Sequence, residues 1–351
     1  MFDIDFYMKI NDFRKKLEKG GTFDPELILA TLEDARNSNP IIYNIETTNA
    51  CNMRCKMCPR TTMMTRAVET IDPGLFQKII DQIEPHSPAL WKKWENFIEE
   101  EYGCKEDEMS ENHFFLRIIP KVIQLHGYGD PLLDKNMPKY VKLMSSKGIP
   151  SYFSCNPANI DVDKTLEMFR NGLDYIKYSI ESVDDNNHKI IRGEASNFTE
   201  SYNNIVNLLK IKKLEGHKAT VIITMLNLNR KTQISEFDML RKKFENLDVY
   251  IYLKSEDQQW YRKDFHGTNS IHWGEFCKHP WMSVTVKSNG EIAMCMEDFN
   301  NEIILGDARV DSLKDIWNGD KYAKFRKDHV FGTKGIKCTE QCDMKIVKDY
   351  I

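Results

Sequence analysis

The segment IIYNIETTNACNMRCKMCP, residues 41–59, joins a short apolar run to three cysteines in a CxxxCxxC spacing. The run over 41–47 predicts a buried strand, because β-branched and aromatic residues dominate it and polar turn residues follow. Cys51, Cys55 and Cys58 lie in the loop that leaves this strand. Three thiolates so close in sequence can bind three corners of an iron–sulfur cube, which leaves the fourth iron open for chemistry.

A zinc knuckle is the alternative for these three thiols. Structural zinc takes four ligands, commonly from two CxxC-like pairs, and no fourth Cys or His lies close by in the sequence. Buried cysteines without a ligand are a further alternative, which three thiols after one predicted strand disfavour. We therefore expect an iron–sulfur cluster.

Short β-branched or aromatic runs alternate with longer amphipathic runs along most of the chain. This alternation is typical of βα units around a parallel sheet. The predicted strands span residues 41–47, 122–127, 149–155, 175–180, 219–226 and 249–254. The predicted helices span residues 73–84, 136–147, 163–171, 198–215 and 232–245. We expect an α/β fold, namely a partial (β/α)6 TIM-like barrel, which is open because a closed barrel needs eight units.

The barrel is one of four predicted parts. These are an N-terminal helical extension over 1–40, the barrel over 41–254, a polar linker over 255–276 and a small C-terminal β-hairpin and helix domain over 277–351. A helical insertion interrupts the barrel at about 86–118, where apolar residues from Leu90 to Tyr102 repeat at helical spacing. We expect this helix to pack on the outside of the barrel rather than to form a substrate lid.

Composition excludes several classes of protein. The 351 residues are 41% hydrophobic and 29% charged, which excludes a disordered chain. The net charge of −4 makes nucleic acid an unlikely partner. No stretch approaches the roughly 18 apolar residues of a membrane span, and acids replace the basic start of a signal peptide. We expect a cytoplasmic protein without a membrane partner, whose nine cysteines serve metal binding or catalysis before disulfides.

A second group of cysteines lies near the carboxyl terminus. MSVTV and EIAMC flank a turn at 288–290 and predict a β-hairpin with Cys277 before it and Cys295 at its end. Cys338 and Cys342 form a later pair that completes four ligands. These residues alone fit a zinc ribbon with four cysteine ligands nearly as well as an iron–sulfur site.

From about residue 41 onward the sequence resembles the radical S-adenosylmethionine superfamily. In that family, S-adenosylmethionine chelates the open iron and is cleaved to a 5′-deoxyadenosyl radical, which abstracts a substrate hydrogen atom. The resemblance implies that Cys51, Cys55 and Cys58 hold the catalytic [4Fe–4S] cluster. It also implies a reducing partner such as flavodoxin or ferredoxin.

Further segments resemble the S-adenosylmethionine contacts of the family. His126-Gly-Tyr-Gly-Asp-Pro131 resembles the GGEP motif, with Tyr128 in place of its first glycine and Asp130 in place of its glutamate. Ser154-Cys-Asn156 resembles the TNG stretch and Ser179-Ile-Glu181 the SxD stretch, and Arg192 follows where many relatives carry an arginine. The alternative for each is a turn, a strand cap or a surface charge. The resemblance implies these S-adenosylmethionine contacts: Gly129, Asp130, Asn156, Ser179, Glu181 and Arg192.

The C-terminal pattern CxHPW, GxxxxC and a final cysteine pair resembles the SPASM/twitch extension of the family. Four cysteines favour a twitch-type domain with one auxiliary [4Fe–4S] cluster on Cys277, Cys295, Cys338 and Cys342. Of the two remaining thiols, Cys104 is most simply incidental and Cys155 most simply a small buried residue. Cys155 nevertheless ends a predicted barrel strand, so it is also our candidate for a catalytic hydrogen-atom donor of the epimerase type.

These features predict an enzyme that oxidises, epimerises or dehydrates a small polar substrate such as a sugar or aminocyclitol. Peptide maturation is the first alternative, which the forty residues before the barrel disfavour because a leader-binding module of that family needs about 80. A non-catalytic zinc protein with four cysteine ligands is the second alternative.

Overall fold

The computed structural model describes residues 1–19, 21, 24–106, 108–255, 277–333 and 335. Nearly all of the predicted linker, as well as Cys338 and Cys342, lies outside these residues. Among the described residues, no helix is both long enough and apolar enough to cross a membrane.

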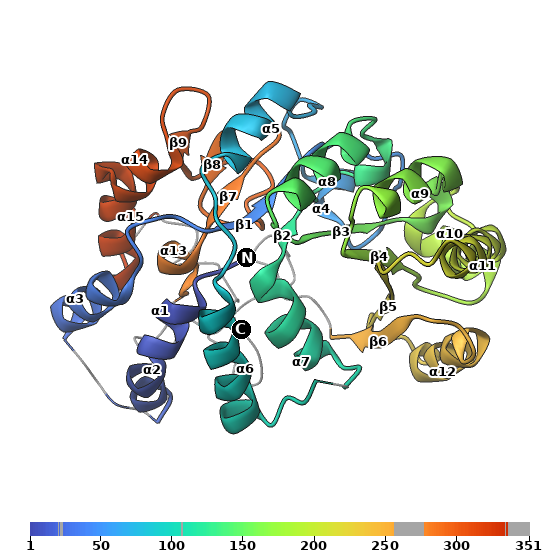
Figure 1. The fold of residues 1–351 in the computed structure, drawn as a ribbon, viewed down its shortest axis with the longest axis horizontal. Coiled ribbons are helices and arrows are strands. Elements are labelled where there is room, and N and C mark those ends of the chain that lie inside the picture. Colours follow the sequence, from blue (N-terminus) through green and yellow to red (C-terminus); the bar gives the residue numbers. More distant parts are fainter. Residues whose placement is uncertain (20, 22–23, 107, 256–276, 334, 336–351) are drawn as a thin grey trace.

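A single nine-stranded sheet runs through the molecule, in the order β6-β5-β4-β3-β2-β1-β7-β8-β9. Its first six strands are parallel and confirm the six predicted βα strands. They are β1 (Ile42–Ile45), β2 (Ile123–Gln124), β3 (Ser151–Cys155), β4 (Tyr175–Ser179), β5 (Thr220–Leu226) and β6 (Tyr250–Lys254). Figure 1 shows them as an open arch, as expected of a partial TIM-like barrel.

The C-terminal hairpin continues the same sheet. Strand β7 (Val284–Val286) pairs in parallel with β1, and β8 (Glu291–Ala293) and β9 (Ile304–Asp307) follow in antiparallel order. The predicted turn is present, with Gly290 at φ +88°, a backbone conformation that glycine adopts without strain. The hairpin therefore satisfies the edge of β1 that an open barrel would leave unpaired.

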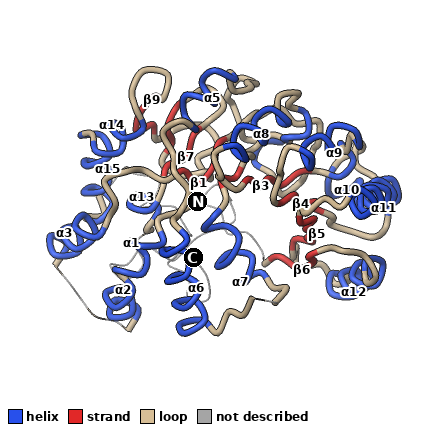
Figure 2. Tube along the Cα trace, viewed as in Figure 1, coloured by secondary structure: helices blue, strands red, loops and turns tan. Residues whose placement is uncertain are grey.

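Helices cover the convex side of the arch, as Figure 2 shows. They are α5 (Pro73–Ile80), α8 (Met137–Ser146), α9 (Val162–Arg170), α11 (Phe198–Glu215) and α12 (Gln233–Phe244). Alternate strand residues such as Phe153, Ile176 and Ile223 join these helices in the larger apolar cluster, the convex cluster. One short helix of this layer, α10 (Asp185–Arg192), is absent from the sequence prediction because only two of its eight residues are buried.

The concave side of the arch is filled by a second apolar cluster, the concave cluster. It joins strand residues such as Tyr152 and Ile222 to Trp94 of α6 (Pro88–Tyr102) and to Phe114, which follows α7 (Glu111–His113). The N-terminal helix α1 (Ile4–Lys9) packs against α6 in the same space (Figure 1). The predicted placement of the insertion on the outside of the barrel is wrong, because the apolar interior of an open barrel needs cover of its own.

Helix α4 (Pro59–Thr62) directly follows Cys58. The remaining α-helices belong to the N-terminal extension and the C-terminal region, and they are α2 (Asn11–Glu18), α3 (Pro25–Ala35), α13 (His279–Met282), α14 (Leu313–Asn318) and α15 (Asp320–Val330). Helix α3 contacts α15, so the two ends of the described chain lie together beside the hairpin.

Trp94→Ala should destabilise the protein by about 3–5 kcal/mol. The Trp94 ring is fully buried, packs edge-on against Phe2 and Tyr7, and donates a 2.7 Å hydrogen bond to the Leu116 carbonyl. Chemical denaturation followed by circular dichroism measures the change. The control is Leu214→Ala, which truncates a side chain that is 85% exposed and should alter stability by no more than about 0.5 kcal/mol.

Candidate functional site

The cysteine loop leaves the carboxyl end of β1 and is held by the end of α10. The Arg54 amide donates to the Arg192 carbonyl at 3.0 Å, and the Lys56 amide donates to the Ile191 carbonyl at 2.9 Å. A Cβ on Gly193 would lie only 3.0 Å from Arg54, so this close approach favours glycine. Helix α10 therefore fixes the backbone on which the predicted ligands lie.

The three thiols of this loop are packed together and largely buried. Burial, together with the neighbouring Cys55 and Cys51, raises the pKa of Cys58 to about 12. Burial also raises the pKa of Cys51, to which Asp130 and Cys55 add. Thiolates that repel one another in a buried loop need a cationic partner, and an iron–sulfur cluster supplies one. The donor set therefore fits the predicted catalytic cluster.

A single metal ion does not fit this loop equally well. Within the described ranges, no three His, Cys, Asp or Glu side chains converge on one ion position. A mononuclear zinc site requires such convergence, whereas the thiolates of an iron–sulfur cube bind different irons.

Arg192 and Glu181 lie beside the thiols. One Arg192 nitrogen donates to the Cys55 sulfur at 3.7 Å, and another forms an ion pair with Glu181. Burial opposes the charge of Arg192, but Glu181 and Cys55 raise its pKa above the usual value. Its Nε is buried with no hydrogen-bond partner among the described residues, so one donor of the guanidinium remains for an anionic ligand group.

The GYGD loop after β2 docks onto the start of the cysteine loop. A Cβ on Gly129 would lie 2.1 Å from the Thr48 carbonyl oxygen, so only glycine fits there. The next amide, of Asp130, donates to the Ala50 carbonyl at 2.8 Å. The predicted GGEP-like position of this loop therefore lies directly against the residue before Cys51.

The Asp130 carboxylate joins this loop to the end of β3. It accepts hydrogen bonds from the Asn156 amide at 3.1 Å and from the Asn159 side chain at 2.7 Å. Asn159 in turn bonds to Asn52 of the cysteine loop. Burial raises the pKa of Asp130, so the carboxylate depends on these donors. Asp130 and Asn156 are thus brought together near the thiols.

Ser179 and Cys155 lie on neighbouring strands. Ser179 ends β4 opposite Thr224, half-buried and two residues before Glu181. Cys155 is 6% exposed in the convex cluster with Phe153, whereas Tyr152 of the same strand lies in the concave cluster. Cys155 therefore faces the helices rather than the concave side, because strand residues alternate between faces. Its role as a hydrogen-atom donor stays a prediction. Cys104 is buried within the insertion.

Two of the four predicted auxiliary ligands lie in the described part of the chain. The Cys277 amide donates to a His329 ring nitrogen at 3.1 Å, and burial raises the pKa of the Cys277 thiol. Cys295 is 8% exposed, and its sulfur accepts a hydrogen bond from the Glu297 amide at 3.4 Å. The positions of Cys338 and Cys342 fall outside the described residues.

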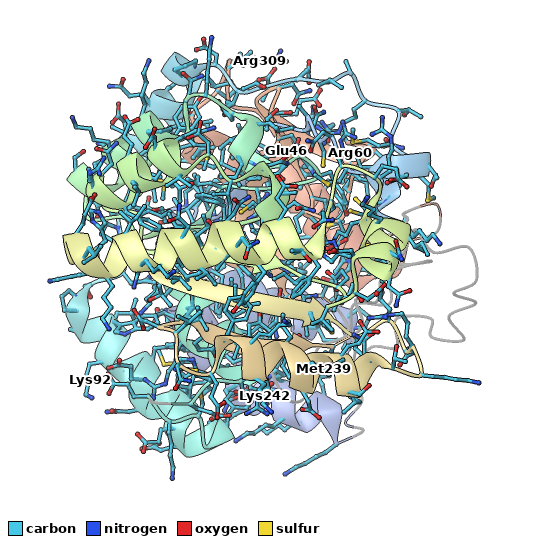
Figure 3. The ribbon with its side chains drawn as sticks, turned by 90° about the vertical axis from the view of Figure 1, so that its right-hand side faces the viewer. Glu46, Arg60, Lys92, Met239, Lys242 and Arg309 are labelled. Atoms are coloured by element: carbon cyan, nitrogen blue, oxygen red, sulfur yellow. The ribbon has the colours of Figure 1, made fainter. Side chains whose placement is uncertain are left out.

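Glu46, one residue beyond β1, connects the cysteine loop region to the C-terminal hairpin. Its fully buried carboxylate accepts two hydrogen bonds from Arg66, at 2.8 and 2.9 Å, and one from the Ser288 hydroxyl at 3.0 Å. It also accepts from the Tyr128 amide at 3.1 Å. Figure 3 shows Glu46 in the upper half of the molecule, apart from the exposed Met239 of α12.

Electrostatics favour the charged form of this carboxylate. Burial alone would raise the pKa of Glu46, but Lys287 and Arg66 hold it below its usual value. Arg66 also donates to the Phe299 carbonyl at 2.7 Å, next to the segment that follows Cys295. Glu46 is not among the site residues predicted from the sequence. An acid that ends an otherwise apolar strand, five residues before the first cysteine, is the signal that marks it.

Tyr128, the departure from the GGEP pattern, has a partner in the C-terminal region. Its hydroxyl donates to the Glu297 carboxylate at 2.9 Å. The Tyr128 side chain thus reaches from the GYGD loop to the segment after Cys295.

Comparison with known proteins agrees with this site. A family model of the radical SAM superfamily matches residues 45–237, more than half of the chain, and a model of the SPASM iron–sulfur cluster-binding domain matches residues 277–343. The chain belongs to the radical SAM superfamily and carries a C-terminal SPASM domain. Its cofactors are S-adenosylmethionine, a [4Fe–4S] cluster and auxiliary iron–sulfur binding in the SPASM domain.

The chain is 21% identical over 298 residues to the S-adenosyl-L-methionine-dependent 2-deoxy-scyllo-inosamine dehydrogenase of Niallia circulans, covering 84% of this chain and 88% of that protein. Among solved structures, anSMEcpe with bound AdoMet has a TM-score of 0.54 at 12% identity, over 82% of each chain. Streptococcus suis SuiB bound to the precursor peptide SuiA has a TM-score of 0.50 at 13% identity, over 90% of this chain and 79% of that one. These structural matches show the shared fold.

Gly129→Ala should weaken S-adenosylmethionine binding by at least about tenfold, because the added Cβ must push the GYGD loop away from Thr48. Equilibrium dialysis of the anaerobically reconstituted protein measures the change. The matched control is Gly216→Ala, a helix-terminal glycine at φ +70° with nothing within 4 Å, which should lower stability by about 1 kcal/mol and leave binding unchanged. Equal binding by both variants would contradict the placement of this loop.

Glu46→Gln should destabilise the protein by about 3–5 kcal/mol at pH 7, because it leaves buried Arg66 and Lys287 without their counter-charge. The pKa of Glu46 is lowered in the folded state, so its carboxylate contributes fully above the unfolded pKa of about 4.3, and this contribution is lost as the pH falls through the lower folded pKa. In urea denaturation, the difference in unfolding free energy between wild type and variant should therefore narrow below about pH 4.3. Glu215→Gln is the control, since Glu215 also forms a two-pronged pair, with Arg170, but on the surface, where we expect no measurable change.

Proposed function

We propose that this protein is a dehydrogenase that oxidises a hydroxyl group of a small polar substrate, of the sugar or aminocyclitol class, to a ketone. The observation that carries the proposal is the similarity along nearly the whole chain to an aminocyclitol dehydrogenase, which spans both the radical SAM region and the SPASM domain. An auxiliary cluster suits such a reaction because it can accept the electron that ketone formation releases.

The residue assignments of the site are part of the same proposal. Cys51, Cys55 and Cys58 would hold the catalytic cluster, which supplies the electron for cleavage of S-adenosylmethionine. Cys277, Cys295, Cys338 and Cys342 would hold one auxiliary [4Fe–4S] cluster. The cofactor contacts would be Gly129, Asp130, Asn156, Ser179, Glu181 and Arg192, of which Arg192 has a buried donor to spare.

Asp130 and Arg192 have complementary roles in this assignment. Asp130 presents a buried carboxylate whose pKa is raised by burial, a position that favours a cationic ligand group such as an amine. Arg192 places a positive charge beside Cys55 of the cysteine loop, where it would bind a carboxylate. The two ends of an amino-acid moiety therefore find opposite charges on either side of the thiols.

We also propose a reducing partner such as flavodoxin or ferredoxin and a cytoplasmic location. The partner follows because a cluster with an open iron needs a low-potential electron donor. The location follows because clustered thiols need a reducing compartment.

The test is to incubate the reconstituted enzyme with 2-deoxy-scyllo-inosamine, and with a panel of sugars and cyclitols, each deuterated at the carbinol carbon. Deuterium should move into 5′-deoxyadenosine and a ketone should accumulate, as measured by mass spectrometry. Incorporation of one solvent hydrogen without a ketone would instead indicate an epimerase, and conversion of peptides alone would indicate a maturase. The Cys51→Ala, Cys55→Ala, Cys58→Ala triple variant should form no 5′-deoxyadenosine yet keep an auxiliary-cluster signal in electron paramagnetic resonance.

A further inference from the structure

Lys177 of β4 is a buried lysine on the concave side of the arch. Its sequence neighbours Ile176 and Tyr178 belong to the convex cluster, so Lys177 faces the other way. It lies opposite Ser154 of β3 and Ile222 of β5, and it is 8% exposed. A charged side chain so deeply buried is rare unless it is paired.

No acid pairs with Lys177 in the described part of the chain. Its ammonium lies over two aromatic rings, 5.3 Å from the centre of Phe114 and 5.8 Å from that of Tyr152. The two acids whose charge acts on Lys177 already bind other groups. Glu111 binds Ser255, and Glu181 binds Arg192 and the Leu226 amide. Among the described residues, the amine therefore has no counter-ion of its own.

The charged group with the largest effect on Lys177 carries the same charge. Burial lowers the pKa of Lys177 to about 7, and among the charged groups around it Lys254 at the end of β6 has the largest effect, also downward. Glu111 and Glu181 act in the opposite direction, and Arg192 adds to the lowering. His126 faces the same space, where burial and Lys177 hold its pKa at about 3, so it is a poorer proton acceptor at neutral pH. A desolvated amine beside a second cation is the usual arrangement for a lysine that acts without its proton.

Lys177 also lies near the groups assigned to S-adenosylmethionine. Glu181 lies four positions after Lys177, beyond the end of β4, and both Glu181 and Arg192 act on the charge of Lys177. A substrate presented to a radical formed beside Arg192 would therefore lie within the reach of this side chain.

We propose that Lys177 is the base of the reaction, whose amine takes the hydroxyl proton of a substrate bound on the concave side of the arch. This inference rests on the proposed dehydrogenase function. The carbinol carbon loses its hydrogen atom to the 5′-deoxyadenosyl radical, the oxygen loses its proton to the Lys177 nitrogen, and one electron passes to the auxiliary iron–sulfur cluster. The carbon–oxygen single bond becomes the double bond of the ketone, and Lys177 becomes an ammonium ion.

The first experiment needs no substrate. The anaerobically reconstituted protein is labelled with trace acetic anhydride across pH 6–10, and the reactivity of each lysine is measured by peptide mass spectrometry. Lys177 should reach half-maximal reactivity near pH 7. Lys243 is the matched control, because it also lies over two rings, those of Phe198 and Tyr202, but is exposed to solvent, and its labelling is followed in the same digest.

The Lys254→Met variant tests whether the charge of Lys254 lowers the pKa of Lys177. Removal of the like charge should move the Lys177 labelling profile to higher pH and leave the labelling of Lys243 unchanged. The proposal would be overturned if the Lys177 profile coincided with that of Lys243, if Lys177 did not react at any pH, or if Lys254→Met did not change its profile.

The second experiment distinguishes whether Lys177 accepts a proton or only contacts the substrate. With carbinol-deuterated 2-deoxy-scyllo-inosamine, Lys177→Arg and Lys177→Met should both still transfer deuterium to 5′-deoxyadenosine, which also shows that they fold and bind both ligands. Both should lose at least about 100-fold in ketone formed per 5′-deoxyadenosine, because neither side chain accepts a proton. In the wild type this ratio should rise as the pH increases through 7.

Two outcomes would refute the role of Lys177: normal ketone formation by either variant, or loss only in Lys177→Met, which would indicate a charge contact that arginine replaces. Failure of the proposed function looks different, since the wild type itself would then give no ketone while the labelling result for Lys177 stands.

Discussion

The buried carboxylate of Glu46 is the constraint on which the rest of the structure depends. A charge removed from water is stable only if neighbouring groups replace its hydration, and here Arg66, Tyr128 and Ser288 do so from three separate segments. These segments are the chain after the cysteine loop, the S-adenosylmethionine motif and the C-terminal hairpin. One acid therefore holds the catalytic and auxiliary regions in a single arrangement.

Backbone hydrogen bonds of the sheet also connect the barrel to the SPASM domain. The Glu46 amide donates to the Val286 carbonyl at 2.8 Å, and β7 pairs with β1 beside it. The SPASM domain is thus continuous with the barrel in hydrogen bonding, although the two regions are far apart in sequence. Tyr128 and Glu297 extend this continuity towards the segment after Cys295.

The concave side of the arch carries both aromatic and nitrogen-bearing side chains. Six strands leave the barrel open, and the insertion fills the lower part of that opening with rings such as Phe114. His126 and Lys177 also lie on this side, and burial lowers the pKa of both side chains. The concave side therefore combines aromatic rings with nitrogen groups that lose their protons more readily than usual.

Much of this protein follows from its sequence alone. The alternation of β-branched and amphipathic runs determined the six parallel strands and their helices, because burial on both faces of a sheet requires that composition. The spacing of Cys51, Cys55 and Cys58 determined the kind of cofactor, since ligands so close in sequence must lie close in space. The C-terminal hairpin followed in the same way from its turn and flanking strands.

Tertiary structure alone decided the rest. Period-two alternation shows that Ser154 and Cys155 face opposite ways, but only packing shows which of the two meets the helices. The position of the insertion inside the arch, the support that α10 gives to the cysteine loop, and the lack of an acid for Lys177 among the described residues all depend on residues distant in sequence. Local patterns determine which groups a segment offers, whereas burial and charge balance depend on what the folded chain brings beside them.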